Sequence, residues 1–289
     1  MKHALPITMI LLISFLLAQF LGLAVIYQYI DQEKSTSEEV VFKEIPFFER
    51  PEVEEKTVFL PVIIAILIGT GIFLLLLKYD LVLVLRIWFF IAISLSLFAA
   101  LQAFIPVVAA LIIAVTIALW RIIKPNFWIQ NITELFIYGG LAAIFVPLFN
   151  LFSGIILLLL ISAYDAYAVW GSKHMIALAK SQSKAHLFAG LVIPYAVGKK
   201  DKSPRVKKIK TKVKTAILGG GDIGFPLIFA GIVLKEIGLG PSLIIPFFAA
   251  AALWILLWKA DEKRFYPAMP FISAGCLLGL AAIWLMGLV

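Results

Sequence analysis

Residues 5–30 read LPITMILLISFLLAQFLGLAVIYQYI, an apolar stretch without a single charged side chain. About 20 apolar residues in a helix already cross the roughly 30 Å hydrocarbon core of a bilayer, so this stretch can span a membrane. It also exceeds the roughly 7–15 residues of a signal-peptide core, and no clear small-x-small cleavage pattern follows it. We therefore predict that residues 5–30 form a retained first span.

Apolar runs of this kind recur along the whole chain. Hydrophobic residues make up 63% of the 289 and charged residues 15%, which excludes an ordinary soluble domain. The predicted fold class is all-α, a polytopic membrane protein with nine transmembrane helices. Charges and prolines place the spans at about 5–30, 57–77, 81–102, 105–123, 131–150, 152–171, 213–234, 238–258 and 266–288. We expect one transmembrane domain over 1–289, with spans one to six in 1–172, a basic loop at 173–212 and spans seven to nine in 213–289.

The basic residues indicate an orientation in the membrane. The formal net charge is +8, and most of the excess lies between Lys173 and Lys214. A basic loop between spans is typical of the cytoplasmic face near anionic lipid, and this loop lacks the folded core that a nucleic-acid-binding module needs. In the other connections between spans, those rich in Lys and Arg alternate with those that have few. This alternation predicts a multi-pass protein of the cell membrane with a cytoplasmic N-terminus and an extracellular C-terminus. The lipid bilayer is thus an expected partner, and nucleic acid is not.

Two further features give only general expectations. The first outer loop carries nine acidic residues from Asp31 to Glu55, and we interpret it as a solvated connection, with a cap or a partner-binding segment as the alternative. Cys276 is the only cysteine, so an intrachain disulfide is excluded.

The ionisable residues within the predicted spans are few, and they include Arg86, Glu134, Asp165 and Asp222. Arg86 and Glu134 lie near the inside ends of their spans, where anchoring at the interface or pairing explains them. Asp165 lies eight residues before Lys173, and Asp222 lies eight residues after Lys214. At about 1.5 Å per helical residue, both would lie roughly 12 Å from the inside boundary of two consecutive antiparallel helices. Equal depth lets their carboxyl groups meet.

Paired carboxyl groups inside a membrane suit either of two functions. Two such groups a few ångströms apart cannot both ionise, so they hold one proton between them. The ionised group can take a proton from water while the protonated group polarises a peptide carbonyl, which is protease chemistry. A proton relay in a secondary transporter needs the same pair. Spacing alone leaves catalysis and transport equally open, although the lack of an internal repeat argues against an inverted-repeat transporter.

The residues around the aspartates indicate irregular backbone. Gly219, Gly220 and Gly221 precede Asp222 and are poor for a rigid helix, although small residues also serve close helix packing. The segment Pro267-Ala268-Met269-Pro270 places two prolines at the start of the last span, which prevents full backbone pairing but is also common at helix starts. Irregular backbone at membrane depth requires burial or a watery cavity.

Together these residues resemble the presenilin and signal peptide peptidase family of intramembrane aspartyl proteases. The resemblance rests on Tyr164-Asp165 in span six, Gly219-Gly220-Gly221-Asp222 as the G-x-G-D motif in span seven, and Pro267-Ala268-Met269 at the P-A-L position in span nine. Nine spans and the large loop between spans six and seven also fit, and the compact length resembles microbial, archaeal single-chain relatives.

The resemblance implies an intramembrane aspartic endopeptidase with a presenilin-like fold and Asp165 and Asp222 as its catalytic dyad. Tyr164, Gly219, Gly220, Gly221, Pro267, Ala268 and Met269 would shape the active site, and the P-A-L-like segment would receive substrate as an extended strand. The implied partners are proteins with transmembrane helices, and no metal or cofactor is expected. The sequence also lacks H-E-x-x-H, and none of its three histidines lies well inside a span to serve a serine nucleophile.

Overall fold

The chain folds into a bundle of long apolar helices in a computed structural model that describes residues 5–36, 40–47, 51, 53–171, 188–197, 212–260 and 266–288. The helices that precede the basic loop are α1 (Leu5–Tyr29), α2 (Phe59–Lys78), α3 (Val82–Gln102), α4 (Val107–Ile123), α5 (Phe127–Phe145) and α6 (Leu151–Ala166). A 3-10 turn at Val146–Leu148 follows α5, and a π-helical turn at Tyr167–Gly171 follows α6. The remaining elements are β1 (Gly190–Val197), β2 (Lys212–Gly219), α8 (Gly220–Glu236), α9 (Leu239–Ser242), α10 (Ile244–Lys259) and α11 (Met269–Leu285).

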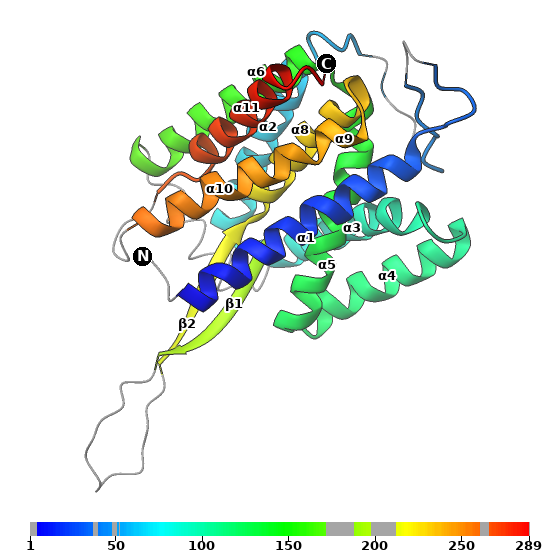
Figure 1. The fold of residues 1–289 in the computed structure, drawn as a ribbon. Helices are drawn as coiled ribbons and strands as arrows, with labels where there is room; N and C mark the ends of the chain where they lie inside the picture. The colour runs from blue at the N-terminus through cyan, green and yellow to red at the C-terminus, as the bar shows by residue number, and fades with distance from the viewer. Residues whose placement is uncertain are drawn as a thin grey trace, which may run out of the picture.

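These helices match the composition of a membrane protein. Within the described residues, six helical segments are long and apolar enough to cross a bilayer, and α4 and α11 are shorter apolar helices. Large hydrophobic side chains such as Leu83, Val108 and Leu278 are exposed on their outer faces, where lipid replaces water as the solvent. The predicted helical, multi-pass membrane fold is confirmed. In Figure 1, α1 and α11 run in the same direction, so the chain begins and ends at opposite ends of the bundle.

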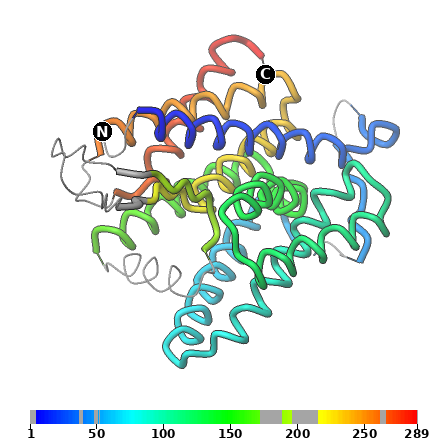
Figure 2. The backbone as a smooth tube through the Cα atoms, turned by 90° about the horizontal axis from the view of Figure 1, so that it is seen from below, coloured from blue at the N-terminus to red at the C-terminus, as the bar shows by residue number. Residues whose placement is uncertain are grey.

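Helix α8 lies at the centre of the bundle. It packs against α1, α5, α6, α10 and α11, and Figure 2 shows it between the helices of the N-terminal and C-terminal parts. Nearly every residue from Ile223 to Leu234 is buried, which is why its sequence is hydrophobic on all sides. Packing is close enough that a Cβ atom at Gly22 of α1 would lie 2.2 Å from the Leu227 side chain. The element that carries Asp222 is therefore surrounded by other helices.

The predicted seventh span is wrong over its first residues. Residues 213–219 were expected to be helical, but they belong to β2, which pairs antiparallel with β1 from Gly190↔Gly219 to Val197↔Lys212. The segment KVKTAILG alternates in polarity at its start and contains β-branched residues, both of which favour an extended strand. Strand β1 lies in the predicted basic loop at 173–212, the rest of which falls mostly outside the described residues. Figure 1 shows both strands extending from α8 toward the end of the bundle where α1 begins.

Candidate active site

Asp165 lies in the last turn of α6, where the regular helix gives way to the π-helical turn. Only 7% of the residue is exposed. Its Oδ2 atom accepts a hydrogen bond of 3.0 Å from the backbone N–H of Met269. Tyr164, the residue before it, is partly buried in the same turn. A backbone donor from the start of α11 thus holds one carboxyl group in place inside the bundle.

The Pro267-Ala268-Met269 segment meets α6 at this point. Tyr266, Pro267 and Ala268 are not helical, and α11 begins at Met269 because the prolines at 267 and 270 lack the N–H groups that a helix interior would use. One turn into α11, the Ser273 hydroxyl accepts a 2.8 Å hydrogen bond from the Ser162 hydroxyl of α6. The predicted irregular start of the last span is confirmed, and it is joined to α6 by hydrogen bonds that include these two.

Asp222 lies in the first turn of α8, directly after the junction with β2. Gly219 is the N-terminal cap of the helix in an extended conformation, with φ −66° and ψ 149°. A Cβ atom at Gly219 would lie 3.2 Å from Oδ2 of Asp222, so the carboxyl group is folded back against the glycine run. Helix α6, which carries Asp165, packs against α8, which carries Asp222. This packing is consistent with the proximity that the spacing of the two residues predicts.

The spacing argument itself needs correction. It assumed a helical rise from Lys214 to Asp222, but five of the residues between them belong to β2. A strand advances about 3.3 Å per residue, more than twice the helical value, so β2 carries the chain farther than the sequence estimate allowed. The estimate for Asp165 also assumed a regular helix as far as Lys173, but α6 ends at Ala166 and the chain continues in the π-helical turn.

The backbone just beyond Asp222 is also irregular. Pro226 lies inside α8 and lacks the N–H that would bond to the Asp222 carbonyl four residues earlier. Gln19 of α1 donates a 2.8 Å hydrogen bond to the carbonyl of Ile223. The first turn of α8 is therefore held partly by α1.

A buried ion pair lies near the glycine run, and the sequence did not predict it. Arg121 of α4 pairs with Glu134 of α5, and the Tyr138 hydroxyl also donates to Glu134. Glu134 was interpreted as an interfacial anchor or a paired residue; it is 1% exposed and fully paired. Arg121, near the end of the predicted fourth span, is 7% exposed. The spacing of Glu134 and Tyr138, four residues apart on one helix face, was the available signal.

A cavity of about 330 Å³ separates this ion pair from α3 and α8. Its lining is mostly apolar and includes Phe89, Ile93, Tyr138, Gly220, Gly221 and Phe225. Gly220 faces Tyr138 so closely that a Cβ atom there would lie 2.6 Å from the hydroxyl oxygen. Among the described residues, no three His, Cys, Asp or Glu side chains come together as a metal site would require.

A membrane-spanning bundle with aspartates at breaks in two adjoining helices has the features of a membrane-embedded aspartyl protease. The family model described as "Signal-peptide peptidase, presenilin aspartyl protease" matches residues 11–288, so the chain belongs to this family. The resemblance predicted from three short motifs is thereby confirmed. The protein is an intramembrane aspartic endopeptidase that acts on transmembrane substrates, and the family favours this function over the secondary transporter that the spacing had left open.

Solved structures support the fold. The chain is similar to a presenilin family intramembrane aspartate protease in a C222 crystal form, with 19% identity and a TM-score of 0.64 over 95% of this chain and 97% of that one. A P2 crystal form gives 18% identity and a TM-score of 0.62 over 96% of both chains. No curated protein matches the sequence. At these identities the likeness establishes the presenilin-like fold alone.

Proposed function

We propose that Asp165 and Asp222 are the catalytic dyad. The observation that carries the proposal is the packing of the three motif-bearing helices: the Met269 N–H at the start of α11 binds the Asp165 carboxyl group of α6, and both helices pack against α8, which carries Asp222. Three segments that are far apart in the sequence would thus supply one site. Asp165 is buried and Asp222 is partly buried, and away from bulk water a proton shared between two carboxyl groups is favoured over two charges.

The proposed chemistry uses one water molecule and no cofactor. The ionised carboxyl group takes a proton from the water as its oxygen attacks the peptide carbonyl, and the protonated group hydrogen-bonds to the carbonyl oxygen. The resulting tetrahedral carbon then releases the amine, which receives a proton from the dyad. The two product ends are a carboxyl and an amino group, and the dyad returns to its singly protonated state.

Substrate would lie in an extended form between β2 and the Pro267-Ala268-Met269 segment. The outer edge of β1 is already occupied by side chains of α5. Within the described residues β2 pairs only with β1, so its other edge can bind an added strand. Gly219, Gly220 and Gly221 lead from this edge to Asp222 and have no side chains to obstruct a peptide backbone. Tyr164, Pro267, Ala268 and Met269 would form the opposite side.

The test is peptide cleavage by purified protein carrying Asp165→Ala or Asp222→Ala. Each variant should insert normally and lose cleavage, because hydrolysis needs both an acid and a base. Asp80→Asn is the matched control, since Asp80 is exposed in the turn between α2 and α3 and should leave activity unchanged. Near wild-type turnover by either site variant, with contaminating proteases excluded, would refute the dyad. Transport of a solute across vesicles that contain the protein but show no peptide cleavage would instead support a secondary transporter.

We also propose that the whole chain is one transmembrane domain with the basic loop 173–212 in the cytoplasm and the acidic loop outside. The alternation of basic residues supports this orientation. The parallel course of α1 and α11 supports the placement of the two termini on opposite sides.

A further inference from the structure

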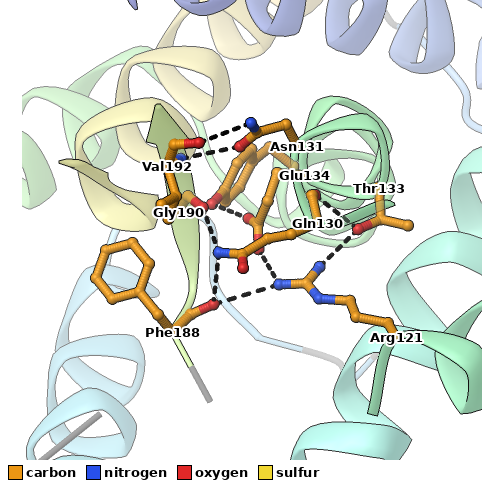
Figure 3. Close-up of polar contacts among 9 residues, drawn as sticks. Arg121, Gln130, Asn131, Thr133, Glu134, Phe188, Gly190 and Val192 are labelled. Atoms are coloured by element: carbon orange, nitrogen blue, oxygen red, sulfur yellow. Dashed lines mark hydrogen bonds and ion pairs between the residues drawn. The ribbon is translucent and has the colours of Figure 1, made fainter. Parts of the chain in front are cut away.

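The outer edge of β1 is held by two amide side chains from the first turns of α5. Asn131 makes a reciprocal pair with Val192: its Nδ2 donates to the Val192 carbonyl at 2.8 Å, and its Oδ1 accepts from the Val192 N–H at 2.9 Å. A neighbouring strand would make the same two bonds. Gln130 Nε2 donates to the carbonyl of Gly190 at 3.0 Å and to that of Phe188 at 3.3 Å. Figure 3 shows both amides directed at the strand.

Arg121 extends this contact to the start of the strand. Its guanidinium donates to the Phe188 carbonyl at 3.3 Å and to the Thr133 hydroxyl at 2.7 Å, while it also pairs with Glu134. Since Arg121 and Glu134 are buried, the orientation of the guanidinium is set by protein groups. We call Arg121, Gln130 and Asn131 the β1 clamp.

The clamped segment is joined to the residues before Asp222. Gly190 pairs with Gly219, and the Gly220 N–H donates to the Ala189 carbonyl at 3.2 Å. Asp222 follows two residues later. On the other side of Gly220 lies Tyr138, whose hydroxyl donates to Glu134. The glycine run therefore contacts the β1 clamp through the strands and its supporting ion pair through Tyr138.

We propose that Arg121, Gln130 and Asn131 are positioning residues, which hold β1 against α5 and thereby set the position of Asp222. The inference rests on the proposed dyad. It follows from the weakness of the parts that lead to Asp222. A two-stranded sheet is marginal by itself, and three consecutive glycines restrict the backbone little. The position of the carboxyl group must then be set by contacts outside the glycine run, and the β1 clamp supplies them.

Two readouts separate positioning from a purely structural role. The first is cleavage kinetics of Asn131→Ala, which removes both bonds to Val192. We expect kcat to fall by roughly 10- to 100-fold, as for an ångström-scale displacement of a catalytic group, with a smaller change in KM. The neighbouring control is Ile132→Ala, which truncates an exposed side chain of the same helix turn and should leave kcat unchanged.

The second readout measures position without activity. On a Cys276→Ser background, cysteines replacing Asp165 and Asp222 are linked by a short bifunctional thiol reagent, with and without Asn131→Ala. We expect Asn131→Ala to lower the cross-linking yield several-fold, while Ile132→Ala has no effect. Failure of the parent cysteine pair to cross-link would count against the dyad, and the kinetic comparison would then decide the role of the clamp.

A pair of tyrosines controls for loss of stability. Tyr138→Phe removes the hydroxyl that supports Glu134, and Tyr29→Phe removes another buried hydroxyl, which donates to the Ala99 carbonyl at 2.7 Å near the opposite end of the bundle. Both should lower thermal stability in detergent by similar amounts, but only Tyr138→Phe should lower kcat. Any of three results would overturn the proposal. The first is a kcat of Asn131→Ala within twofold of wild type. The second is a loss of kcat in Asn131→Ala without a change in the cross-linking yield, provided that the cysteine pair cross-links in the parent protein, and the third is an equal loss of kcat in the two tyrosine variants.

Discussion

The buried Arg121–Glu134 pair allows a quantitative test of how α4 and α5 are held together. The side chains are 7% and 2% exposed, and each has a second partner: Arg121 donates to Thr133, and Glu134 accepts from Tyr138. The perturbation is a cycle of four proteins: wild type, Arg121→Met, Glu134→Leu and the double variant. These replacements roughly keep side-chain volume while removing one charge or both.

The structure predicts strongly non-additive losses. Glu134→Leu leaves a buried guanidinium with only neutral acceptors, and Arg121→Met leaves a buried carboxylate with a hydroxyl donor. Loss of one partner from a buried ion pair costs about 3–5 kcal/mol, because the other charge stays uncompensated. The double variant removes both charges and leaves mainly the Tyr138 hydroxyl unpaired, which costs about 1–3 kcal/mol. The double variant should thus lose far less than the sum of the singles, about 6–10 kcal/mol.

The assay is equilibrium unfolding of the purified proteins in mixed micelles, with the free energy of unfolding compared across the cycle. The control is a second cycle that combines Arg86→Met with a substitution at another exposed residue far from it. Because Arg86 is exposed, the losses in free energy of unfolding should add in this cycle. Two results would refute the reasoning. One is additive loss in the Arg121 and Glu134 cycle. The other is a loss below about 1 kcal/mol for Glu134→Leu, which would be the behaviour of a solvated surface pair.

Three further outcomes are expected. Gly140→Ala should destabilise the protein by about 1–3 kcal/mol or more in the same unfolding assay, because the new Cβ atom would lie 1.8 Å from the Ser96 carbonyl oxygen. Gly69 has open space around it, so Gly69→Ala should be neutral or slightly stabilising. Single cysteines on a Cys276→Ser background should react with an impermeant reagent in intact cells within 31–55 but not within 173–214, and the reverse would overturn the orientation. The first cuts in a reconstituted model substrate should fall in the cytoplasmic half of its transmembrane span, as located by mass spectrometry at early times. Cleavage should be faster when weak helix formers lie in that half. Cuts clustered in the outer half would contradict this prediction.

Charge and hydrophobicity were sufficient to predict most of the helices. Spans such as 5–30 and 81–102 agree with α1 and α3 to within about two residues, because a run of apolar residues bounded by charges has few alternatives in a bilayer. The same rule failed at 213–219. An apolar run of this length does not distinguish a strand from the start of a helix, so the segment was joined to the span that follows it. Its β-branched residues and early alternation were the evidence for β2.

The candidate site also combines features that the sequence could predict with features that it could not. The sequence predicts that Asp165 and Asp222 belong to one site because both are rare charges on consecutive spans, and the packing of α6 against α8 is consistent with that prediction. The bond from the Met269 N–H to Asp165 could not, because a backbone donor carries no signal in the sequence. The β1 clamp was also missed: Gln130 and Asn131 are ordinary polar residues near a span boundary, and they acquire a role only once β1 is recognised as a strand with an open edge.

Within the described residues, breaks in regular helix occur beside both aspartates of the proposed dyad. Helix α6 becomes a π-helical turn just after Asp165, β2 changes to α8 just before Asp222, and α11 starts at Met269 after a non-helical segment that contains Pro267. Regular helices leave no backbone group free for a substrate, since every interior N–H and C=O is bonded within the helix. A protease must bind the peptide backbone that it cuts, so it needs unpaired backbone groups at the depth of its catalytic side chains. The breaks beside the proposed dyad would meet that need, while the long helices around them keep their own backbone groups paired.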